Sequence, residues 1–225
     1  MTNMLIDIPV HDMVLKGDLI HFTNSAGLII FSHGSGSSRL SPRNRKVAQI
    51  LNKKGFSTFL FDLLSPEEAT RKEKRFDIEL LSKRLLTVAE WFKNDFRFKD
   101  LNIGLFGAST GSASAIQAAT TLGEGIIQAV VSRGGRPDLA KRYLKLLKTP
   151  TLLLVGGNDK LVLELNEIAY NIMTCPKKLT VIEGASHLFE EPGTLEQVAE
   201  EASSWFRQYL FWPTIKVSKD FIDEW

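Results

Sequence analysis

One stretch decides the fold of this 225-residue chain, Leu101-Asn-Ile-Gly-Leu-Phe-Gly-Ala-Ser-Thr-Gly111. Its first half is apolar and suits a buried strand, and its second half is the pattern G-x-S-x-G centred on Ser109. A serine at the apex of a sharp strand-to-helix turn leaves little room around the backbone, so glycines are expected on both sides. The small residues that follow predict a helix packed closely on a sheet. The stretch therefore predicts a nucleophile elbow with Ser109 as the nucleophile; a plain Gly-Ser turn is the alternative.

A serine nucleophile needs a base that takes its proton and a carboxylate that orients the base. Asp159 follows the apolar run 151–155, and His187 follows the run 179–182. Ser109, Asp159 and His187 thus each follow a predicted strand, in the chain order of an α/β-hydrolase triad. Since the carboxyl ends of parallel strands share one edge, we expect the three side chains to converge. Taken singly, Asp159 is also a common turn residue and His187 a common surface-loop residue.

A second loop predicts the donors that would stabilise an oxyanion. The apolar run 27–31 leads into Ser32-His-Gly-Ser-Gly-Ser-Ser-Arg39, where small residues leave backbone amides free to face a ligand. We assign one donor to the amide of Thr110, directly after the nucleophile, and the other to the amide of Ser35. His33 is expected to hold the loop by hydrogen bonds. A phosphate cradle is the rival interpretation, but the loop lacks the lysine and spacing of a P-loop.

From residue 27 to about 210 the chain resembles a dienelactone-hydrolase-like branch of the α/β-hydrolase superfamily. The resemblance rests on seven segments: residues 32–39, 41–45, 60–64, 107–111, 132–138, 155–159 and 184–192. It implies the α/β-hydrolase fold and the same triad of Ser109, Asp159 and His187. Dienelactone hydrolase itself uses a cysteine at the elbow, so its substrate is not carried over to a chain with Ser109.

Three arginines suggest that the substrate could be anionic. Arg133 and Arg136 follow a predicted strand and so belong to the catalytic edge, and Arg39 ends the oxyanion loop. Guanidinium groups hold carboxylates and phosphates through paired hydrogen bonds, so these arginines are candidate substrate-binding residues. The alternative is that Arg133 or Arg136 forms ion pairs with acidic residues such as Asp62, Glu190 and Glu191.

The rest of the chain predicts an α/β fold with about eight strands, mainly parallel, and helices on both faces of the sheet. Two N-terminal strands, 5–10 and 13–22, precede strands near 27–31, 56–61, 101–106, 126–131, 151–155 and 179–182. Helices are expected from Ser41-Pro42, over 76–94, and from a capping box at Thr194 to about 210. Only one helix fits between 131 and 151, so no lid domain is inserted there. We expect a single domain, 1–225, with 211–225 as a C-terminal extension.

Composition narrows the class of protein. The 28 Lys and Arg against 26 Asp and Glu give a net charge of +2, which offers no case for nucleic-acid binding. No segment approaches the roughly 18 apolar residues of a membrane span, and the N-terminus lacks a signal-peptide pattern. No metal-ligand spacing or cofactor fingerprint occurs. We expect a cytoplasmic protein, a monomer or homodimer, that needs no metal or cofactor and acts on a small molecule.

These features together predict a serine hydrolase of small esters, thioesters or lactones, anionic ones included. Because its base must be neutral, activity is expected to fall as the pH drops through roughly 6 to 7. A non-catalytic small-molecule binding protein with the same fold is the alternative.

Overall fold

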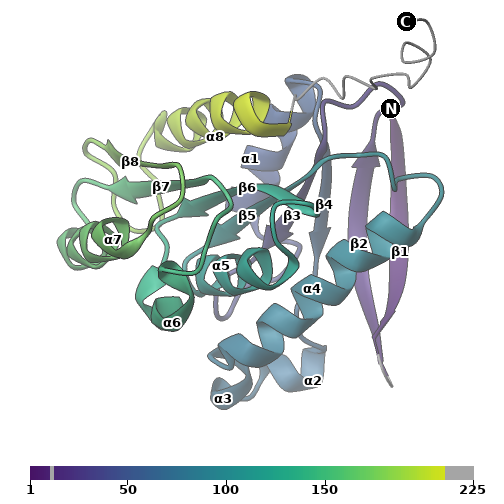
Figure 1. Ribbon diagram of the computed structural model, residues 1–225, viewed down its shortest axis with the longest axis horizontal. Coiled ribbons are helices and arrows are strands. Elements are labelled where there is room, and N and C mark those ends of the chain that lie inside the picture. The colour runs from purple at the N-terminus through teal and green to yellow at the C-terminus, as the bar shows by residue number, and fades with distance from the viewer. Residues whose placement is uncertain (11–12, 211–225) are drawn as a thin grey trace, which may run out of the picture.

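A computed structural model describes residues 1–10 and 13–210, which form a twisted sheet with helices on both faces (Figure 1). The strands are β1 (Thr2–Val10), β2 (Met13–His21), β3 (Leu28–Ser32), β4 (Ser57–Phe61), β5 (Ile103–Ala108), β6 (Ile127–Arg133), β7 (Thr151–Gly156) and β8 (Lys177–Ile182). Their order in the sheet is β1-β2-β4-β3-β5-β6-β7-β8. The pairs β1–β2 and β2–β4 are antiparallel, and all other pairs are parallel. The predicted fold class and eight-stranded, mainly parallel sheet are confirmed.

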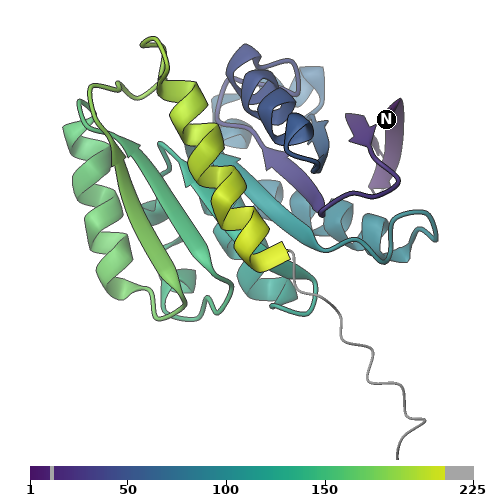
Figure 2. The same ribbon diagram turned by 90° about the horizontal axis from the view of Figure 1, so that it is seen from above.

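Helices cover the two faces unequally. They are α1 (Pro42–Lys53), α2 (Pro66–Ala69), α3 (Lys72–Arg75), α4 (Ile78–Asn94), α5 (Thr110–Leu122), the 3₁₀ turn η1 (Pro137–Ala140), α6 (Lys141–Leu144), α7 (Lys160–Ile172) and α8 (Thr194–Leu210). Helices α1 and α8 lie together on one face, and α4 to α7 lie on the other, as the view from above shows (Figure 2).

Alternation along the central strands divides the apolar core between the two faces. In β3, Ile29 and Phe31 pack with α1 and α8, whereas Leu28 and Ile30 belong to the core beneath α4 and α5. Successive side chains of a strand point to opposite faces, so a strand buried on both sides is mainly apolar. This is why β3 and β7 are apolar over most of their length, whereas β6 carries Gln128, Ser132 and Arg133.

Side-chain caps are present at the helix starts marked by Ser41, Ser65 and Asp77. The Ser41 hydroxyl accepts a hydrogen bond from the Asn44 amide, and Pro42 is the first residue of α1, as predicted. The capping box expected at Thr194 is wrong, because the Thr194 hydroxyl donates to the Glu191 carbonyl and the Gln197 amide bonds to Gly193. A complete capping box occurs instead at the start of α2, between Ser65 and Glu68.

The connection between β6 and β7 contains only η1 and α6, which leaves no room for an inserted lid domain there. The predicted extension 211–225 lies outside the described residues.

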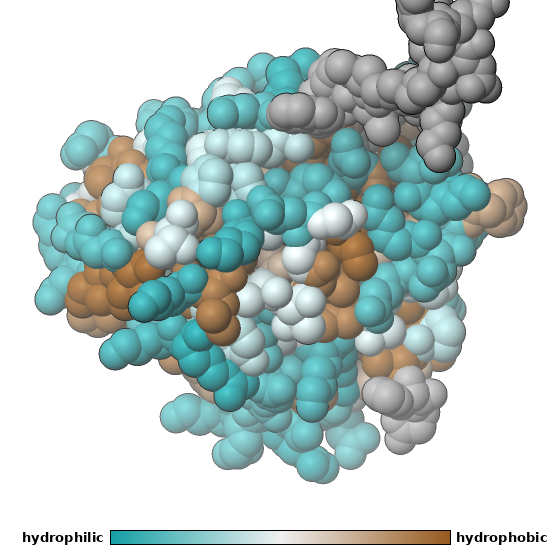
Figure 3. Space-filling view, viewed as in Figure 1, coloured by the Kyte–Doolittle hydropathy of each residue, from teal (hydrophilic) through white to brown (hydrophobic). Residues whose placement is uncertain are grey.

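Hydrophilic residues cover most of the face in Figure 3, and apolar side chains gather in small groups, some near α7, where Leu161 and Ile168 are exposed. In the described part of the chain, no helix has both the length and the apolar character that crossing a bilayer demands.

Candidate active site

Ser109 lies at the junction of β5 and α5 in a strained backbone conformation. Its φ is 52° and its ψ is −122°, in the left-handed half of conformational space that side-chain-bearing residues avoid. A Cβ added at Gly107 would lie 2.4 Å from the Ser112 Cα, and one added at Gly111 would lie 2.2 Å from the Ser32 carbonyl oxygen. Neither position has room for a side chain. This is the backbone arrangement expected of a nucleophile elbow.

His187 and Asp159 are brought together by the neighbouring strands β7 and β8. Nδ1 of His187 lies 2.6 Å from Oδ2 of Asp159, and the carboxylate is largely buried, with 15% of the side chain exposed. With Nδ1–H donating to the carboxylate, the neutral ring presents an unprotonated Nε2. The pair therefore has the orientation that a general base requires.

Further contacts lock the loops that carry this pair. The Asn158 amide donates to the Ala185 carbonyl at 2.9 Å, and the Asn158 side chain donates to the Gly184 carbonyl at 2.8 Å. The Ser186 amide donates to the Glu191 carboxylate, and hydrogen bonds from Ser186 lower the pKa of Glu191. The loop after β7 and the loop after β8 are thus held as one unit.

The oxyanion loop passes directly over the nucleophile. A Cβ added at Gly34 would lie 3.1 Å from the Ser109 Cβ. The Ser35 amide, one of the two predicted donors, donates to the Thr110 hydroxyl at 2.8 Å. Thr110 begins α5, so its own amide has no acceptor within the helix. Both predicted donors therefore lie beside Ser109. In this structure, the Ser35 amide donates its hydrogen bond to the Thr110 hydroxyl.

His33 fixes this loop from beneath. Its Nδ1 lies 3.0 Å from the Gly34 carbonyl oxygen, and its Nε2 accepts a hydrogen bond from the Leu63 amide. Burial lowers the pKa of His33, outweighing the hydrogen bond to Gly34 and the charge of Asp62, which raise it. His33 therefore acts as a neutral link between the loop and the end of β4, in agreement with its predicted structural role.

A cavity of about 240 Å³, here called the serine cavity, opens at this edge of the sheet. Its walls come from the oxyanion loop, the start of α1, the ends of β5 and β6, and the loop after β8. The lining residues are Gly34, Ser35, Ser37, Ser41, Arg43, Asn44, Ala108, Ser109, Arg133, His187 and Leu188. Ser109 and His187 thus face the same space, while Asp159 is bonded to the Nδ1 side of His187.

The three predicted substrate-binding arginines have different surroundings. Arg39 forms ion pairs with Asp62 and, at 3.6 Å, with Asp18. Arg136 makes two hydrogen bonds of 2.8 Å to the Asp138 carboxylate. Neither lines the serine cavity. The alternative of ion pairing thus describes Arg136, although with a different acidic residue from those expected.

Arg133 is the arginine of the three that lines the cavity, and it is buried, with 7% of the residue exposed. Its Nε and Nη1 atoms have no hydrogen-bond partner among the described residues. Burial, with a smaller contribution from the nearby Arg43, lowers the pKa of Arg133 to about 10. The guanidinium therefore keeps its charge at neutral pH.

Arg43 is a lining residue that reasoning from the sequence missed. It lies in the first turn of α1, which carries no acidic residue. A positive charge at a helix N-terminus interacts unfavourably with the helix dipole, so an arginine there without an acidic neighbour indicates a role other than helix stabilisation. The sequence contains this indication, because Ser41 and Pro42 mark the start of the helix.

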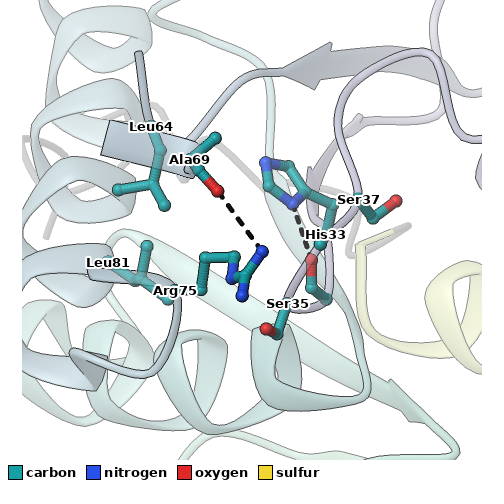
Figure 4. Close-up of a pocket in the computed structure, with 9 residues that line it drawn as sticks. His33, Ser35, Ser37, Leu64, Ala69, Arg75 and Leu81 are labelled. Carbon is teal, nitrogen blue, oxygen red and sulfur yellow. Dashed lines mark hydrogen bonds between the residues drawn. The ribbon is translucent and has the colours of Figure 1, made fainter. Parts of the chain in front are cut away.

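A second, smaller cavity of about 140 Å³, here called the loop cavity, lies on the other side of the oxyanion loop. Figure 4 shows the loop residues His33, Ser35 and Ser37 on one side of it and the apolar residues Leu64, Ala69 and Leu81 on the other. Arg75 lies between them. Gly34, Ser35 and Ser37 line both cavities, so the loop is a wall that the two share.

Known structures resemble the chain closely. It is 47% identical to dienelactone hydrolase from Anabaena variabilis, with a TM-score of 0.89 over 93% of this chain and 98% of that one. Est1E from Butyrivibrio proteoclasticus matches 91% of the chain and is itself covered to 98%, at 17% identity and a TM-score of 0.76. An esterase of Pyrococcus furiosus gives 19% identity and 0.76, over 93% and 92%. At such identities the last two establish the fold alone.

Curated relatives come from two strains of Mycobacterium tuberculosis and are provisionally named phosphoribosyl transferases. They are 52% identical to the chain over 187 residues, which is 83% of this chain. The chain spans only 42% of their length. No protein-family model matches the chain.

Proposed function

Because the chain belongs to the dienelactone-hydrolase-like branch of the α/β-hydrolase superfamily, we propose that it is a serine hydrolase of small esters, thioesters or lactones. One observation carries the proposal: a serine in a strained strand-to-helix turn shares a cavity with a histidine whose Nδ1 lies 2.6 Å from a largely buried carboxylate. Three groups of different chemistry, from three separate strands, meet the requirements of one reaction.

The proposed reaction proceeds in two halves. Ser109 Oγ attacks the carbonyl carbon, His187 Nε2 takes the hydroxyl proton, and the C–O or C–S bond of the leaving group then breaks as His187 returns the proton to it. Water next attacks the acyl group on Ser109, again with His187 as base, and the acid is released. Asp159 keeps the ring oriented and stabilises its protonated form.

The negative oxygen formed in each half needs two donors. The amides of Ser35 and Thr110 are the proposed pair, as both belong to segments that touch Ser109. For Ser35 to serve, its amide must stop donating to the Thr110 hydroxyl and donate to the oxyanion instead. A charged acceptor binds an amide more strongly than a hydroxyl does, which favours this exchange.

The substrate is expected to be compact. The serine cavity, at about 240 Å³, is smaller than the roughly 300–1,000 Å³ typical of drug-sized ligands. Its lining is mainly polar, with Ala108 and Leu188 as the apolar side chains, so a long acyl chain would find little apolar surface. The transferase name of the mycobacterial relatives is not carried over, because the residues proposed to act here are those of a hydrolase triad.

Labelling with a fluorophosphonate, followed by intact mass and peptide mapping, tests the proposal. Wild type is expected to gain one adduct, on Ser109; Ser109→Ala is expected to gain none, and His187→Ala to react far more slowly. A panel of neutral esters and thioesters with short acyl chains then measures turnover. A folded wild type that neither reacts with the probe nor turns over any ester would refute the hydrolase and favour a binding protein.

A further inference from the structure

The serine cavity has a strongly cationic lining. Its ionisable side chains are Arg43, Arg133 and His187, and no carboxylate lines it among the described residues. Hydroxyl groups and one amide fill much of the remaining wall, from Ser35, Ser37, Ser41 and Asn44. Such a lining is matched to a small group that is negatively charged and accepts several hydrogen bonds.

Arg133 is the most unusual part of this lining. A buried guanidinium is ordinarily paired, because water no longer solvates its charge. Arg84 follows the rule: it is 6% exposed and makes two hydrogen bonds to Glu68. Arg133 is as deeply buried, yet no ion pair or side-chain hydrogen bond to it occurs within the described residues. A buried guanidinium that has no partner among the described residues is suited to bind an anionic group of a ligand.

The protein holds Arg133 in place without neutralising it. Its carbonyl accepts a hydrogen bond from the Ser109 amide at 3.1 Å, so the residue is fixed directly beside the nucleophile. Its guanidinium carbon lies 5.8 Å from the centre of the Phe189 ring, near the outer limit of a cation–π contact. Phe189 has a φ of 56° and is 1% exposed, so a strained, buried residue supports the guanidinium. These contacts orient the cation and leave its charge uncompensated.

A second cation lies close enough to act with the first. Arg43 lowers the pKa of Arg133 through its charge, and both line the cavity. One nitrogen of Arg43 binds Glu190, whose side chain is 63% exposed, and its Nε has no partner among the described residues. Two like charges that face one space repel each other, and a bound anion would relieve that repulsion.

We propose that the substrate carries a second oxyanion, a carboxylate or a phosphate, which Arg133 and Arg43 bind in the serine cavity while Ser109 attacks the ester carbonyl. The inference deepens the proposed function and rests on it. Arg133 is a specificity-determining residue in this proposal, and Phe189 is a positioning residue for it.

Matched esters test the inference through specificity. The three substrates are para-nitrophenyl pentanoate, mono-para-nitrophenyl glutarate, in which a carboxylate replaces the terminal methyl group, and the para-nitrophenyl ester of phosphonobutanoate. Wild type is expected to prefer an anionic ester, and the better of the two identifies carboxylate or phosphate as the natural group. Arg133→Met is expected to lower kcat/KM for that ester by about 10- to 100-fold and so to lower the ratio of anionic to neutral ester hydrolysis.

Two further variants separate charge from shape. Arg133→Lys keeps the charge but loses the paired hydrogen bonds, so it is expected to fall between wild type and Arg133→Met. Arg97→Met removes a positive charge before β5, at the opposite edge of the sheet, and is expected to behave as wild type. An anionic-to-neutral ratio that is equal in wild type and Arg133→Met would overturn the anion site and leave the hydrolase intact.

A binding measurement covers the case in which no ester is hydrolysed. Inorganic phosphate or succinate is expected to raise the Tm of wild type and of Ser109→Ala, but not that of Arg133→Met. Without an added anion, Arg133→Met is expected to be at least as stable as wild type, because it removes an unpaired buried charge. Equal stabilisation of wild type and Arg133→Met by the anion would overturn the inference, whatever the outcome for hydrolysis.

Discussion

Nδ1 of His187 lies 2.6 Å from Oδ2 of Asp159, although 28 residues separate the two in the chain. Because β7 and β8 are adjacent and parallel, the loops that follow them leave the sheet side by side. Asn158 ties the two loops together through two hydrogen bonds. The pair is therefore fixed by the sheet before any substrate is present.

Replacing Asp159 by Asn tests what this contact contributes. An amide can donate to Nδ1 and stabilise the wrong tautomer, and it cannot compensate a protonated ring. We expect kcat for ester hydrolysis to fall by about 10⁴-fold while the fold is kept. Steady-state kinetics and circular dichroism measure the two effects. A variant with nearly wild-type kcat at neutral pH would remove Asp159 from the proposed triad.

The Ser35 amide can be tested with a matched pair of variants. Ser35→Pro removes the N–H, whereas Ser35→Ala removes only the side chain. We expect kcat to fall by about 10²- to 10³-fold in the proline variant and to change little in the alanine variant. Thermal melts of both variants show whether the loop remains folded. Equal activities would mean that the oxyanion has a different second donor.

The glycine two residues after the nucleophile is sterically required. A methyl group at Gly111 would lie 2.2 Å from the Ser32 carbonyl oxygen, so the backbone of β3 or of α5 must move. Gly111→Ala is expected to lose about 1 to 3 kcal/mol of unfolding free energy. Gly125→Ala is the control, since nothing lies within 4 Å of its added Cβ, and a change within about 0.5 kcal/mol is expected. Urea denaturation compares the two.

Strain at Ser109 predicts a difference between two inactive variants. Glycine adopts a φ of 52° without steric cost, whereas alanine keeps the strain of the serine. Ser109→Gly is therefore expected to be more stable than Ser109→Ala by about 1 kcal/mol, the loss of chain entropy having offset part of the relief. Equal unfolding free energies would show that the turn stores no strain.

His33 predicts a dependence of stability on pH. Its pKa in the folded protein is below the ordinary 6.5, so the unfolded chain binds the proton more tightly. Neutral His33 makes its full contribution to the free energy of unfolding above pH 6.5. This contribution is lost as the pH falls from 6.5 through the lower pKa that His33 has in the folded protein. Tm is expected to decline less steeply between pH 7 and 5 in His33→Asn than in wild type. Parallel declines would assign the acid sensitivity to other groups.

Much of the fold was predictable because the central parallel strands are buried on both faces, unlike the edge strand β8. Residues 28–31 and 152–155 are therefore apolar without interruption, and strands β3 and β7 each end one residue beyond these runs. The same logic placed Ser109, Asp159 and His187 after strands. Convergence at one edge then follows from parallel topology, without knowledge of any side-chain contact.

The surroundings of the arginines were not predictable in this way. Arg39, Arg133 and Arg136 all belong to loops or strand ends at the same edge, so sequence position could not rank them. Their difference depends on which carboxylate lies within about 4 Å, and Asp138 reaches Arg136 while no carboxylate reaches Arg133 among the described residues. Helix caps are equally hard to predict from sequence. The Gln197 amide donates to the Gly193 carbonyl, so α8 starts one residue earlier than the predicted capping box requires, and the Thr194 hydroxyl bonds to Glu191 instead.

The oxyanion loop separates two cavities that share only the wall formed by Gly34, Ser35 and Ser37. For protein engineering this means that most side chains lining one cavity can be changed without changing a side chain that lines the other. A library at Leu64, Arg75 and Leu81 would reshape the loop cavity without altering any side chain in contact with the serine cavity. Selection on one side could then proceed while the nucleophile, its base and the buried guanidinium stay as they are.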